Sequence, residues 1–232
     1  MSEVDGLTMR EARDRYFMEN GFGPSGGYDD PWVDFKLGPI PMPFPNTKAR
    51  VRAVGYHDLH HVLTGYRTDI VGEFEISAWE IAAGCKGFGA AWALNLGGMA
   101  GGLFRAPARC FAAFVRGRRE RTTYGEDTEA LLRMAVTEAR RRFSPGGAPR
   151  RATLGDVALF GGATAAGIVV ALMLFGLVLP LLPVGLITNA LRTRGRDSTN
   201  GGRRSGEERA DLSCQSSTSS TGNGSSSSMP TR

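Results

Sequence analysis

Apolar side chains recur at helical spacing over most of the first 143 residues. In the stretch from Asn46 to Leu63, one face collects Val51, Val54, Leu59 and Val62 at about 100° per residue. Such a pattern predicts packed helices rather than a sheet, so we expect an all-α domain. Helices are predicted within residues 1–22, from Asn46 or Thr47 to Leu63, from Thr68 or Asp69 to about Ala83, from Pro107 through Phe114, and over 126–143.

Residues that favour helix ends support these boundaries. Thr8 and Glu11 have the spacing of a capping box, in which each side chain accepts from a backbone N–H of the other residue. Gly65 and Gly84 follow the second and third predicted helices, where glycine commonly ends a helix. Pro107 suits the first position of its helix, because that position needs no backbone donor.

A stretch rich in glycine and proline, residues 23–45, interrupts the helical pattern. No helix continues through the proline spacing between Pro39 and Pro45, so this segment is predicted to be an extended, polyproline-like lead-in. Its apolar residues are expected to anchor it to the helical domain. They are Trp32, Phe35, Leu37, Ile40 and Phe44.

The pattern changes again after residue 143. Residues 144–156 are predicted to be a linker, and residues 157–191 contain no charged side chain, which exceeds the roughly 20 residues needed to cross a bilayer. We expect one tilted span over about 158–180, or a helix, a proline turn and a second helix that dip into the membrane. Arginines flank the segment on both sides and leave its orientation open. Residues 192–232 are expected to be disordered.

The overall charge adds one constraint. The net charge is +5 and the sequence pI is about 9.4, which permits an anionic partner. The charge alone does not distinguish a nucleic acid from an anionic membrane surface. We expect a membrane as partner and no nucleic acid. The three cysteines are odd in number and widely spaced, so no disulfide framework is predicted.

All three histidines of the chain lie in five residues, His57-Asp58-Leu59-His60-His61. His57, Asp58 and His61 fall on an arc beside the apolar face of their helix, whereas His60 points to the opposite side and is expected to meet solvent. A short turn at Gly65 should bring Glu73, in the first turn of the next helix, back to His61. Two nitrogen and two oxygen donors suit zinc or another divalent first-row ion, and the alternative is a buried polar network without metal.

Three other protein classes have sequence motifs similar to this one. Metalloproteases of the His-Glu-x-x-His type have glutamate where this chain has Asp58. Membrane di-iron desaturases need several histidine boxes, and His-Asp phosphohydrolases need a histidine further upstream. The chain has no histidines left for either class.

The order His-Asp-x-x-His, eleven residues and then Glu resembles the signature of the coenzyme Q (ubiquinone) biosynthesis protein 4 family. Here it reads His57-Asp58-Leu59-His60-His61 with Glu73 at the matching distance. Gly65, Gly72 and the lead-in from Pro39 to Pro45 agree with the pattern, and the resemblance covers about residues 5–143. The C-terminal hydrophobic segment departs from it, because family members usually lack an obvious integral span.

The resemblance implies a mostly helical, membrane-associated protein that binds a divalent metal, commonly zinc, through His57, Asp58, His61 and Glu73. It implies a role in ubiquinone biosynthesis, namely metal-dependent C1 decarboxylation, with hydroxylation, of a polyprenylated hydroxybenzoate. The alternative is a non-catalytic, lipid-binding scaffold for other quinone-biosynthetic proteins. Arg67 and Glu80 are candidates for substrate contacts. The expected location is a bacterial or mitochondrial inner membrane.

Overall fold

The structure is a computed structural model and describes residues 4–33, 36–37, 40–41, 44–146 and 151–178, with the single positions 183 and 187. Residues Met1–Leu182 form one compact unit and Pro183–Arg232 a second, and every element described here belongs to the first. The predicted disordered tail, 192–232, lies outside the described residues.

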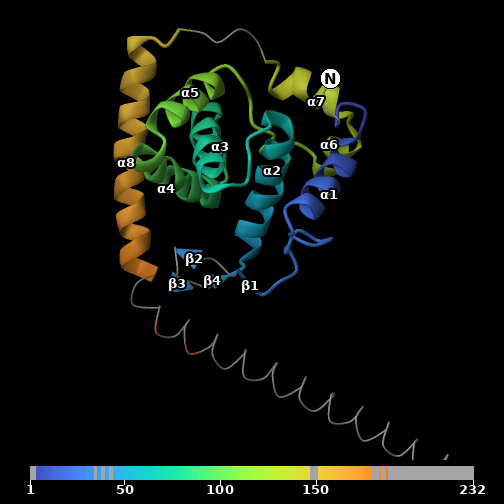
Figure 1. The fold of residues 1–232 in the computed structure, drawn as a ribbon, viewed down its shortest axis with the longest axis horizontal. Helices are drawn as coiled ribbons and strands as arrows, with labels where there is room; N and C mark the ends of the chain where they lie inside the picture. Colours follow the sequence, from blue (N-terminus) through green and yellow to red (C-terminus); the bar gives the residue numbers. More distant parts are fainter. Residues whose placement is uncertain are drawn as a thin grey trace, which may run out of the picture. The chain divides into compact units, whose positions relative to one another are not determined.

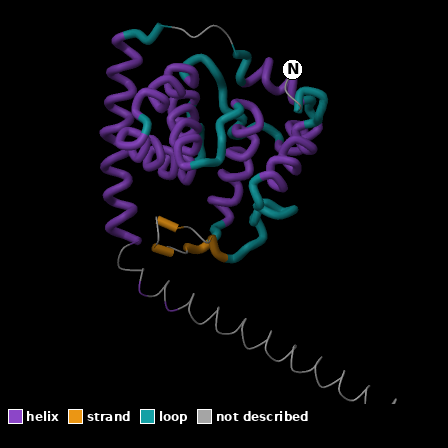
Figure 2. Tube along the Cα trace, viewed as in Figure 1, coloured by secondary structure: helices purple, strands orange, loops and turns teal. Residues whose placement is uncertain are grey.

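The described chain is all-α, as predicted. Helices account for most of it, and strands are confined to short segments before α2 (Figure 2). The helices are α1 Met9–Glu19, α2 Lys48–Thr64, α3 Ile70–Ala83, α4 Gly89–Arg105, α5 Pro107–Gly117, α6 Thr128–Arg133, α7 Val136–Phe143 and α8 Leu154–Val178 (Figure 1).

Local signals in the sequence set the ends of the helices that carry the histidines and Glu73. Thr47 caps α2, and Gly65 ends it with φ of 75°, a left-handed conformation that favours glycine. Asp69 caps α3 by accepting from the backbone N–H groups of Val71 and Gly72. The capping box between Thr8 and Glu11 is formed at the start of α1. These predicted boundaries are therefore confirmed.

Within the lead-in, residues 32–33, 36–37, 40–41 and 44–45 are extended, as predicted, and form two short antiparallel ladders, whereas residues 24–29 form turns. β1 Trp32–Val33 pairs with β4 Phe44–Pro45, and β2 Lys36–Leu37 pairs with β3 Ile40–Pro41. Trp32 is half-buried. The side chains of the other predicted anchors, Phe35, Leu37, Ile40 and Phe44, lie outside the described residues.

The core is built around α3, which packs mainly against α4 and α5 (Figure 1). Trp79, Ile76 and Ala78 of α3 are fully buried. Glycine permits the close approach of α5, since a Cβ at Gly117 would collide with the backbone carbonyl of Trp79. The small residues of this region therefore serve helix packing.

The prediction of a single helix over 126–143 is wrong. The chain forms α6 and α7 instead, separated by Met134 and Ala135 in extended conformation. The Met134 carbonyl accepts from the Met9 N–H at 2.8 Å, and the Val136 N–H donates to the Leu7 carbonyl at 2.9 Å. Pairing with the segment before α1 replaces the helical hydrogen bonds that these residues would otherwise make.

In the described part of the chain, α8 is the one helix long and apolar enough to cross a membrane. Within Leu154–Gly176, the most apolar window of 18 residues has a mean hydropathy of 2.2, and 11% of that window is buried. The helix begins at Leu154, so the predicted linker, 144–156, ends earlier than expected. The proline turn considered after residue 180 lies outside the described residues.

One face of α8 packs on the helical domain. The α4 backbone approaches so closely that a Cβ at Gly167 would collide with the Leu96 carbonyl. The Phe160 ring packs edge-on against Phe111 and Phe114 of α5, with centroids 5.2 and 5.4 Å apart. Residues on the other face, including Val169, Leu172 and Met173, are exposed.

Candidate metal centre

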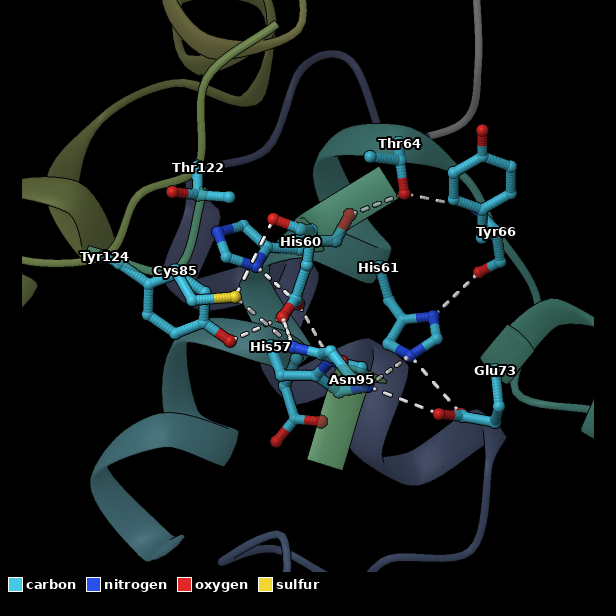
Figure 3. Close-up of polar contacts among 12 residues, drawn as sticks. His57, His60, His61, Thr64, Tyr66, Glu73, Cys85, Asn95, Thr122 and Tyr124 are labelled. Carbon is cyan, nitrogen blue, oxygen red and sulfur yellow. Dashed lines mark hydrogen bonds and ion pairs between the residues drawn. The ribbon is translucent and has the colours of Figure 1, made fainter. Parts of the chain in front are cut away.

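Three side chains from two helices converge on one point. His57 and His61 lie one turn apart on α2, and Glu73 lies in the first turn of α3 (Figure 3). The two Nε2 atoms are 3.2 Å apart, and the Glu73 carboxylate oxygens lie 3.3 Å from each of them. One ligand atom from each residue lies within 4.8 Å of the others. The group could therefore hold a metal ion.

The turn between α2 and α3 brings Glu73 to the histidines. Residues 65–69 fold back so tightly that a Cβ at Gly72 would collide with the backbone of Arg67. Gly72 also donates its N–H to Asp69 at 2.9 Å, which fixes the first turn of α3. Glycine at position 72 is thus needed for the approach that places the next residue, Glu73, beside His61.

Hydrogen bonds determine which nitrogen of His61 carries a proton. Its Nδ1 lies 2.9 Å from the Tyr66 carbonyl, which can only accept. Nδ1 must therefore be the donor, and in the neutral ring Nε2 has a free lone pair that faces His57 and Glu73. A histidine ligand whose other nitrogen donates to a carbonyl is the usual arrangement at metal sites.

His57 is held in the same way by a carboxylate. Its Nδ1 lies 2.8 Å from Oε1 of Glu80, a fully buried residue on α3. Burial alone would raise the pKa of Glu80, but the charges and hydrogen bonds of His57 and His60 lower it below its usual value. Glu80 is thus an anion that accepts from Nδ1 of His57, which directs the His57 Nε2 toward His61 and Glu73.

Two facing Nε2 lone pairs beside a carboxylate require a cation. Without a metal, a proton takes that place. Burial lowers the pKa of His57, but the Glu80 charge and hydrogen bonds to Glu73 and Glu80 outweigh it, so this pKa lies well above its usual value. Burial raises the pKa of Glu73, yet hydrogen bonds and charges from both histidines lower it to about 2. The group is built to hold positive charge.

His60 is not exposed, contrary to the prediction. It is fully buried, and its Nδ1 lies 2.7 Å from Glu80 Oε1. Its Nε2 accepts from the Thr123 backbone N–H at 2.8 Å, so Nδ1 carries the proton. The face of α2 opposite the apolar stripe is covered by the segment around Thr123, which sequence periodicity on α2 does not reveal.

Asp58 lies outside the convergent group in this structure. Its carboxylate accepts from the Tyr28 hydroxyl at 2.5 Å and lies 3.5 Å from the Tyr16 hydroxyl. Three of the four predicted ligands thus come together, and the role of Asp58 as a fourth ligand stays a prediction. Tyr16 also stacks on the His61 ring, with centroids 5.4 Å apart.

The two residues predicted to contact substrate make contacts within the protein, and their role toward a substrate stays a prediction. The Arg67 side chain is 79% exposed and forms an ion pair with Asp69 at 2.9 Å, which places it on the surface. Both oxygens of Glu80 are engaged by donors of the protein, so this carboxylate holds histidines. In addition to His57 and His60, Glu80 accepts from Asn95 and from Tyr124, the latter at 2.5 Å.

Sequence reasoning missed Asn95, Thr123 and Tyr124 as supports of the centre. One signal for Asn95 was present, because it is the single polar side chain in the otherwise apolar stretch 88–104. A buried polar residue in such a helix needs a partner, and here the partner is Glu80. No comparable pattern marks Thr123 or Tyr124.

The affinity of this group for a divalent metal ion is expected to rise with pH. Because the pKa of His57 is raised, the metal-free chain is protonated there at neutral pH, and a metal must displace that proton. Affinity should increase about tenfold for each pH unit below the His57 pKa and level off above it. Chelator competition over the neutral range, with proton release measured in weak buffer, checks this. An affinity independent of pH would contradict the proton assignment.

The fold and the site define a helical protein with a two-histidine, one-carboxylate group able to hold a metal ion and a helix able to cross a membrane. No protein-family model, curated protein or solved structure matches the chain.

Proposed function

We propose that this chain is a membrane-associated, metal-dependent protein of ubiquinone biosynthesis that removes the C1 carboxyl group of a polyprenylated hydroxybenzoate, with hydroxylation of that carbon. The observation that carries the proposal is the convergence of His57, His61 and Glu73, three of the four site residues in the motif that resembles the coenzyme Q biosynthesis protein 4 family. The apolar α8 supports the membrane association.

The arrangement of donors supports a catalytic rather than a purely structural metal. Catalytic zinc sites commonly have three protein ligands and an open fourth position, whereas structural sites have four protein ligands. Here Asp58 is held by Tyr28, which leaves three converging donors. The Glu73 side chain is 41% exposed, so the group is accessible from outside. Zinc, manganese, iron and cobalt are all compatible with nitrogen and oxygen donors.

The hydroxybenzoate head group of the proposed substrate has oxygen atoms that such a metal centre could bind. A divalent metal bound there would supply positive charge to a carboxylate or phenolate oxygen of the substrate. Loss of CO₂ breaks the bond between C1 and the carboxyl carbon and leaves the electron pair on C1. Protonation of C1 completes a simple decarboxylation, whereas hydroxylation also requires a two-electron oxidant such as dioxygen. Tyr66 and Glu80 would hold the two imidazoles in place throughout.

The alternative is a non-catalytic scaffold that binds a prenylated quinone precursor and organises other quinone-biosynthetic enzymes. One observation favours it: a metal held by His57, His61 and Glu73 would join α2 to α3 and so stabilise the fold on its own. In that case the metal would be structural, and the membrane helix would serve to gather partners.

The deciding experiment follows the carboxyl carbon. The purified chain, loaded in turn with zinc, manganese and iron under air, is incubated with a prenylated 4-hydroxybenzoate labelled in its carboxyl group. We expect labelled CO₂ from the wild-type chain and none from Glu73→Gln. Turnover by a Glu73→Gln chain that has lost its metal would contradict the catalytic proposal. Absence of CO₂ from every loaded form, together with retained prenyl lipid, would support the scaffold.

A further inference from the structure

The basic run that follows α5 lies beside a cavity that His57, His61 and Glu73 do not line, although Tyr66, whose carbonyl accepts from His61, forms part of its wall. The cavity has a volume of about 610 Å³ and lies along α5, between α3 and the segments that precede α8. Its walls combine apolar side chains with three arginines. The lining residues used here are Phe111, Ala112, Val115, Arg109, Arg116 and Arg119.

The cavity lies at the N-terminal end of α8. Ala152, two residues before that helix, forms part of its lining. Arg118, in the same basic run, lies 3.6 Å from Asp156 in the first turn of α8. Phe111, which lines the cavity, also packs on Phe160 of α8. If α8 enters a bilayer, the cavity therefore lies at the level where the helix meets the lipid head groups.

The charges around the cavity leave an excess of one positive charge. Arg109 forms two hydrogen bonds with Glu75, at 2.9 and 2.6 Å. Arg116 contacts Glu120 at 3.1 Å and also donates to Ser144 and to the Thr64 carbonyl. For Arg119, the described residues supply no carboxylate partner. The three arginines and two glutamates together carry one net positive charge, which matches a ligand with one negative charge.

The apolar wall indicates an amphiphile rather than a free ion. Phe111, Ala112 and Val115 offer hydrocarbon surface next to the guanidinium of Arg119, and arginine binds phosphate through paired N–H donors. A phospholipid with a single phosphodiester charge has a phosphate for the guanidinium and hydrocarbon for the apolar wall. Its phosphate would lie at Arg119 and the start of its acyl chains along Phe111 and Val115.

We propose that this cavity binds an anionic phospholipid of the membrane leaflet at the N-terminal end of α8. The site rests on the proposed membrane association but not on the metal chemistry. It gives the arginines around position 119 a specific role, because lipid binding there would fix the depth and rotation of the domain on the membrane surface.

Native mass spectrometry of the whole chain, purified in detergent and offered phosphatidylglycerol and phosphatidylcholine together, tests the site. The wild-type chain is expected to retain phosphatidylglycerol preferentially. Arg119→Gln should reduce that preference about fivefold, the effect of one arginine near an anionic surface. Ala112→Phe should also reduce it by filling the cavity without a change of charge.

The matched control is Arg133→Gln, which removes the same charge from an exposed position on α6. It should leave the lipid preference unchanged. Equal retention of the two lipids by the wild type would overturn the proposal, and so would an equal loss in the Arg119→Gln and Arg133→Gln chains. Inorganic phosphate is the probe for a free anion: if it displaces phosphatidylglycerol at equal concentration, the apolar wall contributes nothing and the lipid assignment is wrong.

Zinc content, measured in the same samples, separates this proposal from the proposed function. Arg119→Gln should keep its zinc, because Arg119 makes none of the contacts of the metal centre. A chain that loses its lipid preference and keeps zinc leaves the metal chemistry intact. A chain that retains phosphatidylglycerol but releases no CO₂ leaves the lipid site intact.

Discussion

Under the proposed function, Glu73→Gln is expected to bind zinc far more weakly than the wild-type chain. The change keeps the shape of the side chain but removes the only carboxylate of the convergent group, so only the two imidazoles remain. Loss of a ligand should weaken zinc binding by more than the roughly hundredfold that can follow loss of a ligand's hydrogen-bond partner. Bound zinc, measured by elemental analysis after dialysis against a weak chelator, reports the effect. Glu73 is partly exposed, so the variant should fold.

Two controls make this result specific. Glu138→Gln removes a charge from the first turn of α7, at an exposed position outside the group, and should retain zinc like the wild type. Asp58→Asn distinguishes three ligands from four. We expect it to retain zinc, because the Asp58 carboxylate is bound by Tyr28. Retention of zinc by Glu73→Gln would show that the three residues do not form the site.

Of the variants proposed for this protein, Glu80→Ala should lower the free energy of unfolding the most. It removes a fully buried carboxylate and leaves His57, His60, Asn95 and Tyr124 without the acceptor that they share. Removal of one partner from a buried charged network costs about 3–5 kcal/mol of the free energy of unfolding. Denaturant unfolding of the metal-free chain in detergent measures this loss.

The variant Glu80→Gln separates shape from charge in the same position. Its amide group fills the space of the carboxylate but replaces one acceptor oxygen with an NH₂ donor. That donor cannot accept the hydrogen bond of the Tyr124 hydroxyl or of the imidazoles. We expect a smaller loss of stability than in Glu80→Ala, and a tenfold to hundredfold weaker zinc affinity, roughly the effect of losing the hydrogen-bond partner of a ligating histidine. Unchanged stability of both variants would contradict the buried network.

The parts of the centre that the sequence predicts depend on local rules. His57 and His61 share a face because four residues make about one helical turn, and Gly65 and Asp69 set the ends of the two helices. Glu73 then returns to His61 because the turn is short. Each of these steps involves residues close in sequence, so spacing and capping were sufficient to predict them.

The parts that the sequence did not predict depend on distant segments. His60 is buried because Thr123 covers it, and Asp58 is drawn away from the group by Tyr28. The single helix expected over 126–143 is divided because Met134 and Ala135 pair with residues beside α1. Helical periodicity describes one helix at a time, so it carries no information about which segment covers its polar side.

The pairing of residues beside α1 with the segment between α6 and α7 has a consequence for the order of folding. The metal centre joins residues 16 and 23 positions apart, as in the contacts of His57 with Glu73 and Glu80, whereas Asp5 meets Arg140 across 135 positions. Contacts between nearby residues close short loops and form first. During synthesis, α2 and α3 emerge well before α7. The residues that could hold a metal ion, His57, His61 and Glu73, would therefore come together while the ribosome is still producing the segment that closes the domain.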